Sequence, residues 1–378
     1  MRRLVALDLP GGEAFVTALV SCWEAGDAVW PLDQRLPGPA RARLLGALRP
    51  AAAIDTDGEH ALSGGEPVEP GDAVVVATSG TTGEPKGVVL THDAVAASAL
   101  ATSERLAIAP EDDAWCCCLP LAHVGGLSVV LRALALGTGL EVHERFEVER
   151  VAASPTRGVT RISLVPTMLR RLGSRAEAFR TIVLGGSAPP GELPPNVVTT
   201  YGLSETGSGV VYDGVPLQGV EVRIDDGEVC LRAPMLLRAY RDGTVPFDSD
   251  GFFHTGDGGK LTPDGRLVVH GRLAEVIVTG GEKVWPVAVE AVLEGAPGVS
   301  EVAVAGVADP EWGERLVAFV VPAKGAAPPR LEALRDLVRA ELGPVSAPKE
   351  LVVLDALPRT AIGKVRRRTL GELAARAR

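Results

Sequence analysis

The sequence predicts an α/β protein with a doubly wound sheet in a large N-terminal domain, followed by a small α+β domain. From residue 72 onward, short runs of β-branched residues alternate with stretches of helical character, as in a sheet covered by helices. Near residue 215 this alternation gives way to strands that break at Asp-Gly pairs, which favour tight hairpins. The chain has 378 residues, more than a single core usually supports.

In the first half of the chain, residues 72–78 are predicted to form a buried strand, and the helix over 91–106 begins with a capping residue, Thr91 or Asp93. Gly137 favours the end of another helix, because glycine readily adopts the left-handed conformation found there. The same alternation predicts strands at 115–121, 139–142, 161–165 and 180–186, and helices at 12–26, 125–137 and 166–173.

The second half is predicted to begin with a small β-rich subdomain over about 215–270, in which strand pairs at 220–234 and 259–271 form antiparallel hairpins. Helices at 286–296 and 329–342 then alternate with strands at 300–307, 315–321 and 350–354. These elements predict a compact α+β C-terminal domain of about 100 residues.

Composition excludes several classes of partner. The formal net charge is -10, with 38 Lys plus Arg against 48 Asp plus Glu, whereas nucleic acid and anionic membranes attract basic proteins. The longest apolar stretch, near 124–140, is interrupted by Arg132, so no membrane insertion is expected. The apolar run at the N-terminal end is too short for a signal peptide.

The five cysteines argue against a disulfide framework, because their number is odd and no C-x-x-C pair is present. Three of them are adjacent in a predicted buried strand, where cysteine behaves as a small apolar residue. We therefore expect a reducing compartment and a cytoplasmic protein.

The most informative segment is TSGTTGEPKG, residues 78–87, directly after a predicted strand. Its glycines allow tight turns, its hydroxyls and amides suit a polyphosphate, and its lysine adds positive charge. It differs from the common nucleotide loop, because Gly87 and Val88 follow the lysine. A glycine-rich hairpin turn is the alternative interpretation. The residues predicted to bind phosphate are Thr78, Ser79, Gly80, Thr81, Thr82, Gly83 and Lys86.

Together with further segments in the same order, this loop resembles the adenylate-forming superfamily of acyl-CoA synthetases, peptide adenylation domains and luciferases. The resemblance begins near residue 26 and implies an N-terminal portion that is shortened relative to most members. The further segments are LGGSAPP (184–190), TYGLSETG (200–207), FHTGD (253–257), GRLAEVI (271–277) and LPRTAIGK (357–364).

The resemblance implies that these segments bind ATP. Tyr201 is expected to stack on adenine, and Glu205 to coordinate Mg²⁺, because a hard cation that bridges phosphates prefers a carboxylate oxygen. Asp257 is expected to accept hydrogen bonds from both ribose hydroxyls, and Arg272 to contact ribose and phosphate. The remaining residues implied in ATP binding are Gly185, Gly186, Ser187, Gly202 and Ser204.

Lys364 resembles the catalytic lysine of the family. A carboxylate must attack the anionic α-phosphate, so a cation that touches both groups lowers their repulsion. The alternative is a basic tail, formed with residues 366–368, that binds nucleic acid or membrane. The resemblance also implies a large domain over 1–271, a hinge at 272–275 and a mobile C-terminal domain over 276–378. The hinge position holds Ala274, where family members often carry Asp, so the identity of the hinge residue stays open.

VTGGEKVWP (278–286) resembles the loop along which CoA approaches in acyl-CoA synthetases, which assigns Gly280, Gly281 and Glu282 to the thioester step. Residues 119–134 and 201–224 resemble members that act on o-succinylbenzoate, an aromatic dicarboxylate of menaquinone biosynthesis. This resemblance assigns His123, Gly125 and Arg132 to the acyl substrate.

Arg132 is isolated in an apolar helix, and an unpaired buried charge is costly, so the second carboxylate of the substrate is expected to pair with it. A structural salt bridge or a snorkelling side chain is an equal alternative.

The implied reaction uses ATP, Mg²⁺ and CoA. The acid first forms an acyl adenylate, the C-terminal domain then rotates, and the CoA thiol displaces AMP. The alternatives are a CoA ligase for another small aromatic or short acyl acid, a carrier-loading adenylation enzyme, and a nucleotide-binding protein without activity. A homodimer is left open.

Overall fold

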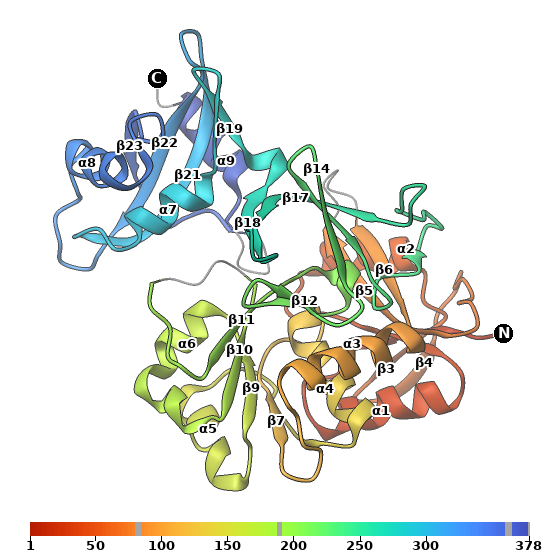
Figure 1. Cartoon of the computed structure of the whole chain (residues 1–378). Coiled ribbons are helices and arrows are strands. Elements are labelled where there is room, and N and C mark those ends of the chain that lie inside the picture. Colours follow the sequence, from red (N-terminus) through yellow and green to blue (C-terminus); the bar gives the residue numbers. More distant parts are fainter. Residues whose placement is uncertain (80–84, 187–190, 360–364, 377–378) are drawn as a thin grey trace. The chain divides into compact units, whose positions relative to one another are not determined.

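The computed structural model describes residues 1–79, 85–186, 191–359 and 365–376 (Figure 1). The chain divides into two compact units. Unit 1 comprises Met1–Arg223, Cys230–His254 and Thr262–Leu267, and unit 2 comprises Ile224–Val229, Thr255–Leu261 and Val268–Arg378. The domain boundaries expected from the sequence stay a prediction.

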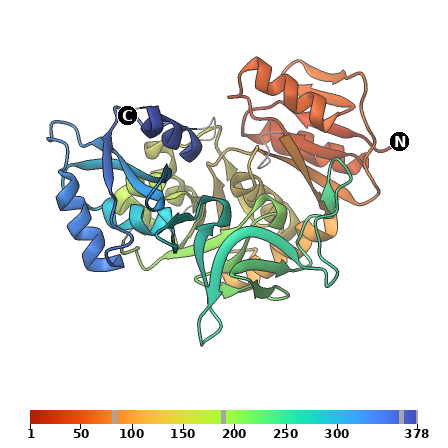
Figure 2. The ribbon, with the colours of Figure 1, turned by 90° about the horizontal axis from the view of Figure 1, so that it is seen from above.

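The first sheet of unit 1 has the strand order β16-β6-β5-β2-β1-β3-β4. Strands β1, β2, β3 and β5 are parallel where they pair, whereas β6 runs antiparallel to β5. Figure 2 shows helices α1 and α2, in red and orange, beside these strands. The bounds are β1 Leu4–Leu7, α1 Glu13–Glu24, β2 Ala28–Pro31, α2 Gly38–Leu48, β3 Ala52–Asp55, β4 Gly58–Ala61, β5 Asp72–Ser79, β6 Pro85–Thr91 and β16 Ala239–Tyr240.

The second sheet of unit 1 has the order β13-β12-β11-β10-β9-β7-β8, and its strands from β8 to β11 are parallel. Its strands are β7 Ala114–Cys117, β8 Gly139–Val142, β9 Arg161–Leu164, β10 Thr181–Leu184, β11 Val197–Gly202, β12 Gly209–Tyr212 and β13 Val215–Pro216. The helical elements are α3 His92–Arg105, α4 Val124–Leu136, α5 Val148–Ala152, η1 Ser154–Arg157, α6 Pro166–Leu172, η2 Gly173–Ala178 and η3 Ser204–Thr206.

Local signals place α3 and α4 where the sequence predicts helices. The Thr91 hydroxyl accepts a hydrogen bond from the backbone of Ala94 at 3.1 Å, so Thr91 rather than Asp93 caps α3. Gly137 ends α4 in the left-handed conformation. The α/β class is confirmed, with the strands of unit 1 distributed over two sheets.

The β-rich segment forms a further sheet in the order β14-β15-β17-β18. Asp226 and Gly227 both have positive φ between β14 and β15, as in the tight hairpin turns that the sequence predicts. The bounds are β14 Glu221–Asp225, β15 Glu228–Arg232, β17 Phe253–Leu261 and β18 Leu267–Arg272.

The remainder of unit 2 is built around a sheet with the order β20-β19-β22-β21, in which β23 pairs with β22. Alternate residues of β21 face different cores, since Val304 packs with α7 and α8 while Ala303 packs with Leu370 of α9. The bounds are η4 Leu273–Glu275, β19 Ile277–Thr279, β20 Glu282–Val284, α7 Pro286–Leu293, β21 Val299–Asp309, β22 Gly313–Pro322, α8 Leu331–Leu342, β23 Glu350–Val353 and α9 Arg367–Arg376.

Within the described ranges, no helix combines the length and the apolar character needed to cross a membrane. The five cysteines are buried, free thiols.

Candidate active site

Strands β5 and β6 bracket the predicted phosphate loop. Thr78 pairs with Lys86, and Ser79 with Pro85, in antiparallel register. A Cβ at Gly87 would lie 2.4 Å from a methyl of Leu48, so only glycine fits where β6 passes α2. The loop residues Gly80, Thr81, Thr82 and Gly83 lie outside the described residues.

The predicted adenine-side residues follow strands of the second sheet. In parallel sheets, ligands bind beyond the carboxyl ends of the strands. Gly185 and Gly186 come directly after β10, and Tyr201 and Gly202 end the neighbouring β11. A Cβ at Gly202 would lie 2.1 Å from the Ser208 carbonyl oxygen, so the turn requires glycine. Ser187 lies outside the described residues.

Glu205 lies in η3, together with Ser204. Inside this turn, the buried Thr206 hydroxyl accepts from the backbone of Leu203 at 2.8 Å and donates to the Ser208 carbonyl at 2.6 Å. The Glu205 carbonyl accepts from the backbone of Leu237 at 2.8 Å. The turn therefore holds the Glu205 backbone in a fixed place.

The Glu205 carboxylate accepts a hydrogen bond from the Tyr240 hydroxyl at 3.0 Å. Tyrosine is neutral, and no lysine or arginine of the described residues pairs with this half-buried carboxylate. Its negative charge is therefore left for a cation, which fits the expected role in binding Mg²⁺.

The same tyrosine reaches Lys86, whose ammonium lies 4.7 Å from the centre of the Tyr240 ring. Sequence analysis missed Tyr240, because the contact depends on the pairing of β16 with β6, far apart in the chain. No local motif marks it, although it is one of only three tyrosines.

His123 immediately precedes α4. Its Nε2 lies 3.7 Å from an oxygen of Asp33, which also accepts a 2.8 Å hydrogen bond from Arg35. Burial raises the pKa of the Asp33 carboxyl, but the hydrogen bonds from Arg35 outweigh it and lower the pKa below its usual value. Sequence analysis missed these partners of His123.

Two neighbouring glycines of α4 differ in their surroundings. A Cβ at Gly126 would lie 2.5 Å from the Leu119 carbonyl oxygen, so this position requires glycine. Gly125, which the sequence assigns to the substrate, is exposed, and its nearest contact would be an ordinary 3.5 Å. Packing therefore explains Gly126 and leaves Gly125 available for another role.

Arg132 is buried in α4, with 2% of its surface exposed. Its guanidinium lies 4.7 Å from the Trp115 ring, and its Nη2 donates to the Ser208 hydroxyl at 3.2 Å. Among the described residues, Nε and Nη1 have no hydrogen-bond partner. Burial lowers the pKa of Arg132, although arginine stays protonated in proteins.

These contacts narrow the alternatives for Arg132. A side chain this buried does not snorkel, and no carboxylate in the described part of the chain pairs with it. The guanidinium lines a narrow cavity of about 10 Å³, roughly one water molecule, with Ser98, Ser128, Gly207 and Met235. The assignment of Arg132 to the acyl substrate stays a prediction.

In unit 2, Asp257 and Arg272 form an ion pair of 3.0 Å between Oδ1 and Nε. Arg272 also donates to the Thr255 carbonyl at 2.9 Å. The two residues assigned to the ribose and phosphate thus lie side by side. The predicted hinge residue, Ala274, lies in η4 directly after Arg272.

The predicted CoA-facing loop is the turn between β19 and β20. Thr279 pairs with Glu282, and the intervening Gly280 and Gly281 both have positive φ, as in a type I′ hairpin. The Gly280 backbone donates to the Trp312 carbonyl at 2.9 Å, which fixes the turn against β22.

Lys364 lies outside the described residues, but its flanks are anchored. Arg359 and Val365 form an antiparallel bridge, and Arg367 pairs with Glu275 at 2.9 Å and with Glu290 at 2.6 Å. Burial raises the pKa of Glu290, an effect that Arg367 opposes. Arg367 is therefore neutralised within the fold and does not extend a basic tail.

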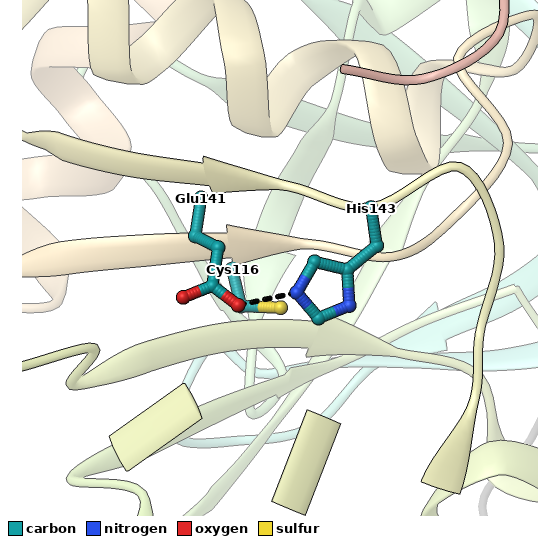
Figure 3. Close-up of side chains that lie close together, drawn as sticks. All are labelled: Cys116, Glu141 and His143. Atoms are coloured by element: carbon teal, nitrogen blue, oxygen red, sulfur yellow. Dashed lines mark hydrogen bonds and ion pairs between the residues drawn. The ribbon is translucent and has the colours of Figure 1, made fainter. Parts of the chain in front are cut away.

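Cys116, Glu141 and His143 bring potential metal-ligand atoms within 4.8 Å of one another (Figure 3). The Glu141 carboxylate, however, accepts hydrogen bonds from Arg157 at 3.0 Å and from Ser154 at 2.8 Å, and it contacts His143. Burial raises the pKa of Glu141, and these bonds, led by Arg157, lower it to about 2. Because Arg157 already pairs with this carboxylate, the cluster does not favour a metal ion.

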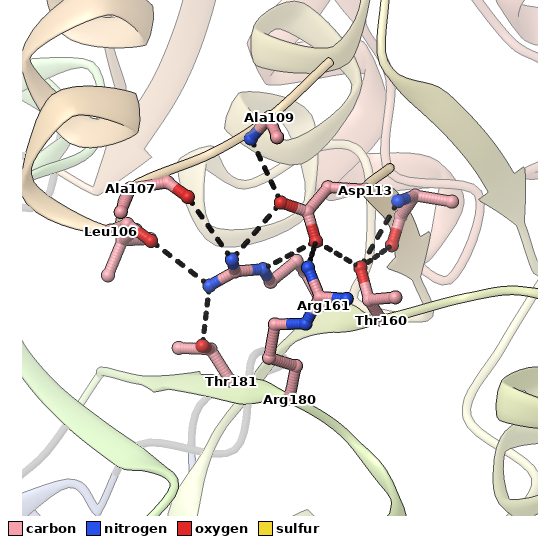
Figure 4. Close-up of polar contacts among 9 residues, drawn as sticks. Leu106, Ala107, Ala109, Asp113, Thr160, Arg161, Arg180 and Thr181 are labelled. Carbon is pink, nitrogen blue, oxygen red and sulfur yellow. Dashed lines mark hydrogen bonds and ion pairs between the residues drawn. The ribbon is translucent and has the colours of Figure 1, made fainter. Parts of the chain in front are cut away.

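Asp113 and Arg161 form a buried ion pair before β7 and at the start of β9 (Figure 4). Arg161 also donates to the Leu106 carbonyl at 3.1 Å and to the Thr181 hydroxyl at 2.5 Å. These residues lie at the amino ends of the parallel strands, opposite the ends that carry the predicted adenine loop. The network stabilises the sheet away from the candidate site.

Two family models match the chain, the AMP-binding enzyme over residues 61–241 and the AMP-binding enzyme C-terminal domain over residues 288–364. A probable 2-succinylbenzoate–CoA ligase of Mycobacterium tuberculosis is 40% identical over 360 residues, covering 88% of this chain and 93% of the relative. The 2-succinylbenzoate–CoA ligase of Listeria innocua is 34% identical, covering 79% of this chain and 70% of the relative.

Solved structures agree with these matches. The o-succinylbenzoate CoA synthetase of Bacillus subtilis, in complex with its acyl-adenylate intermediate, superposes with a TM-score of 0.87 at 30% identity, covering 98% of this chain and 88% of that one. The same enzyme in complex with ATP and magnesium gives a TM-score of 0.85 at 30% identity, with 98% and 90% covered. The chain therefore belongs to the AMP-binding enzyme family.

Proposed function

We propose that this chain is an ATP- and Mg²⁺-dependent acid–CoA ligase that converts 2-succinylbenzoate to its CoA thioester, a step of menaquinone biosynthesis. The relatives named for this reaction cover most of the chain, which supports the proposal. The observation in this chain that favours a dicarboxylic acid is Arg132, a buried guanidinium with two nitrogens, Nε and Nη1, that donate to no described residue.

The reaction has two chemical steps. In the first, a carboxylate oxygen of the acid bonds to the α-phosphorus of ATP, and pyrophosphate leaves with the electrons of the broken P–O bond. Lys86, and by resemblance Lys364, supply positive charge where negative charge accumulates. In the second, the sulfur of CoA bonds to the acyl carbon and gives up its proton to solvent, and AMP leaves with the electrons of the broken C–O bond.

Glu205 is the residue that would hold Mg²⁺, since its carboxylate is bonded to a neutral hydroxyl alone in the described part of the chain. When bound, Mg²⁺ neutralises phosphate charge. Asp257 and Arg272 would bind the ribose side, and Gly280 and Gly281 would line the approach of CoA.

The second carboxylate of the substrate would accept hydrogen bonds from Arg132. A guanidinium binds a carboxylate through paired N–H groups, and burial strengthens that interaction. His123 and Gly125 would border the acyl group.

We place the reaction in the cytoplasm, where ATP and CoA are available. Size-exclusion chromatography decides whether the chain forms a homodimer.

The direct test measures pyrophosphate release and CoA consumption with 2-succinylbenzoate, benzoate and a panel of short acyl acids. We expect turnover with 2-succinylbenzoate that requires ATP, Mg²⁺ and CoA, and far less with benzoate. Preference for another acid would show that the chain is a CoA ligase for that acid instead. Absence of pyrophosphate release with every acid would overturn it.

The two-step scheme has its own test in Lys364→Ala. We expect this variant to lose adenylate formation and to keep thioester formation from supplied acyl adenylate, because only the first step opposes two anions. Single-turnover measurements of both steps check this. Equal loss of both steps contradicts the assigned role.

A further inference from the structure

One aromatic side chain, Tyr240, touches both charged residues of the proposed Mg·ATP site in unit 1. Its hydroxyl donates to Oε1 of Glu205 at 3.0 Å. The ammonium of Lys86 lies over its ring, 4.7 Å from the centroid, which is within the range of a cation–π interaction. Residues far apart in the sequence therefore meet on a single side chain.

The backbone around Tyr240 is bonded to the same two elements. Tyr240 pairs with Val88 in β6, and the next residue, Arg241, donates to the Gly87 carbonyl at 2.7 Å. On the other side, Leu237 donates to the Glu205 carbonyl at 2.8 Å. Backbone hydrogen bonds thus fix Tyr240 both to the strand that carries Lys86 and to the turn that carries Glu205.

The two contacts use different parts of the tyrosine. The negative face of the ring attracts the ammonium, whereas the hydroxyl at its edge donates to the carboxylate. Lys86 and Glu205 both contact this tyrosine. If they lacked this shared partner, they would be free to form a direct ion pair, and that pair would have to break before Glu205 binds Mg²⁺ or Lys86 binds phosphate. The tyrosine satisfies both groups without neutralising either charge.

We propose that Tyr240 is a positioning residue for Mg·ATP, whose hydroxyl orients Glu205 toward the metal and whose ring keeps Lys86 apart from Glu205. The inference rests on the proposed function in that it takes Glu205 as the Mg²⁺ residue and Lys86 as a phosphate residue. It adds a residue with no role in the predicted site.

The test measures ATP affinity by isothermal titration calorimetry, with and without Mg²⁺ and without any acid. Tyr240→Phe keeps the ring and removes the hydroxyl. We expect it to lower the Mg²⁺-dependent gain in ATP affinity about tenfold, the usual size for a hydrogen bond to a charged group. ATP affinity without Mg²⁺ stays within about twofold of wild type, because Lys86 keeps its contact.

Tyr240→Leu removes both contacts, and we expect it to weaken ATP binding without Mg²⁺ as well. Tyr212→Phe is the matched control. It removes a buried hydroxyl that lies 3.2 Å from the Thr102 hydroxyl, and it should leave both affinities unchanged. In a Glu205→Gln background, Tyr240→Phe should have no further effect on the Mg²⁺-dependent gain.

The proposal is overturned if Tyr240→Phe matches wild type, if it weakens ATP binding equally with and without Mg²⁺, or if its effect persists in Glu205→Gln. A wild-type protein whose ATP affinity ignores Mg²⁺ overturns it too. Because no acid is present, failure to activate 2-succinylbenzoate refutes the proposed function without affecting this result.

Discussion

Arg161 and Arg132 are both buried in unit 1, but their partners differ. Arg161 pairs with both oxygens of Asp113, at 3.0 and 3.1 Å, and donates further bonds to a carbonyl and a hydroxyl. Arg132 donates to Ser208 at 3.2 Å, and two of its N–H groups have no partner among the described residues. Within the described residues, the hydrogen-bond donors of Arg161 have partners, whereas two nitrogens of Arg132 have none.

This difference distinguishes a charge that the fold satisfies from one that we propose binds the substrate. A buried arginine that the fold already satisfies gains nothing from a ligand, and its removal costs stability. A buried arginine with unsatisfied N–H groups lowers stability until an anion arrives. The comparison therefore predicts opposite consequences for the two residues.

The largest expected effect is the loss of stability when Arg161 loses its partner. Asp113→Ala leaves Arg161 buried without its carboxylate, so we expect the free energy of unfolding to fall by about 3–5 kcal/mol. Urea denaturation followed by tryptophan fluorescence measures it. The neighbouring, exposed Asp112→Ala is the control and should change stability by less than about 0.5 kcal/mol. A loss below about 1 kcal/mol for Asp113→Ala contradicts the account.

The next effect is the dependence of the free energy of unfolding on pH below about pH 4. Burial raises the pKa of Asp113, but hydrogen bonds from Arg161, Thr160 and the Ala109 backbone lower it to about 2. A lowered pKa stabilises the fold above the unfolded value, near pH 4, and that contribution disappears as pH falls toward 2. We expect a loss of about 2 kcal/mol over this range that is absent in Asp113→Ala. Identical acid profiles would be evidence against it.

On the binding side, Ser208→Ala removes the hydroxyl that orients Arg132. We expect it to weaken the use of 2-succinylbenzoate by about 1 kcal/mol in kcat/KM, the usual net value of one hydrogen bond. Ser103→Ala is the control, because the Ser103 hydroxyl is buried and has no hydrogen-bond partner within the described residues. Equal effects of the two changes would deny Ser208 this role.

The smallest expected effect is the stability of Arg132→Met. Methionine fills a similar volume beside Trp115 without a charge to desolvate, so the free energy of unfolding should stay within about 1 kcal/mol of wild type or rise. Urea denaturation again measures it. A loss above about 2 kcal/mol would place Arg132 with Arg161 among the structural charges.

Features encoded locally could be predicted from the sequence. Thr91 caps α3 and Gly137 ends α4, each through contacts within a few residues. Asp226 and Gly227 form an expected tight turn for the same reason.

Contacts across the chain could not be predicted. Asp33 and His123 meet although they lie far apart in the sequence, and Tyr240 meets Lys86 because β16 pairs with β6. The apolar run around Arg132 indicated that this residue needs a partner. The three-dimensional structure was required to find that none of the described carboxylates supplies one.

The central claim is that the second carboxylate of the substrate accepts hydrogen bonds from the unpaired nitrogens of Arg132. The direct measurement compares kcat/KM of wild type and Arg132→Met with 2-succinylbenzoate and with the analogue that keeps the reacting carboxylate but lacks the other. We predict that the variant loses about 2–5 kcal/mol with the dicarboxylate and little with the analogue. Equal losses with both acids would contradict the claim.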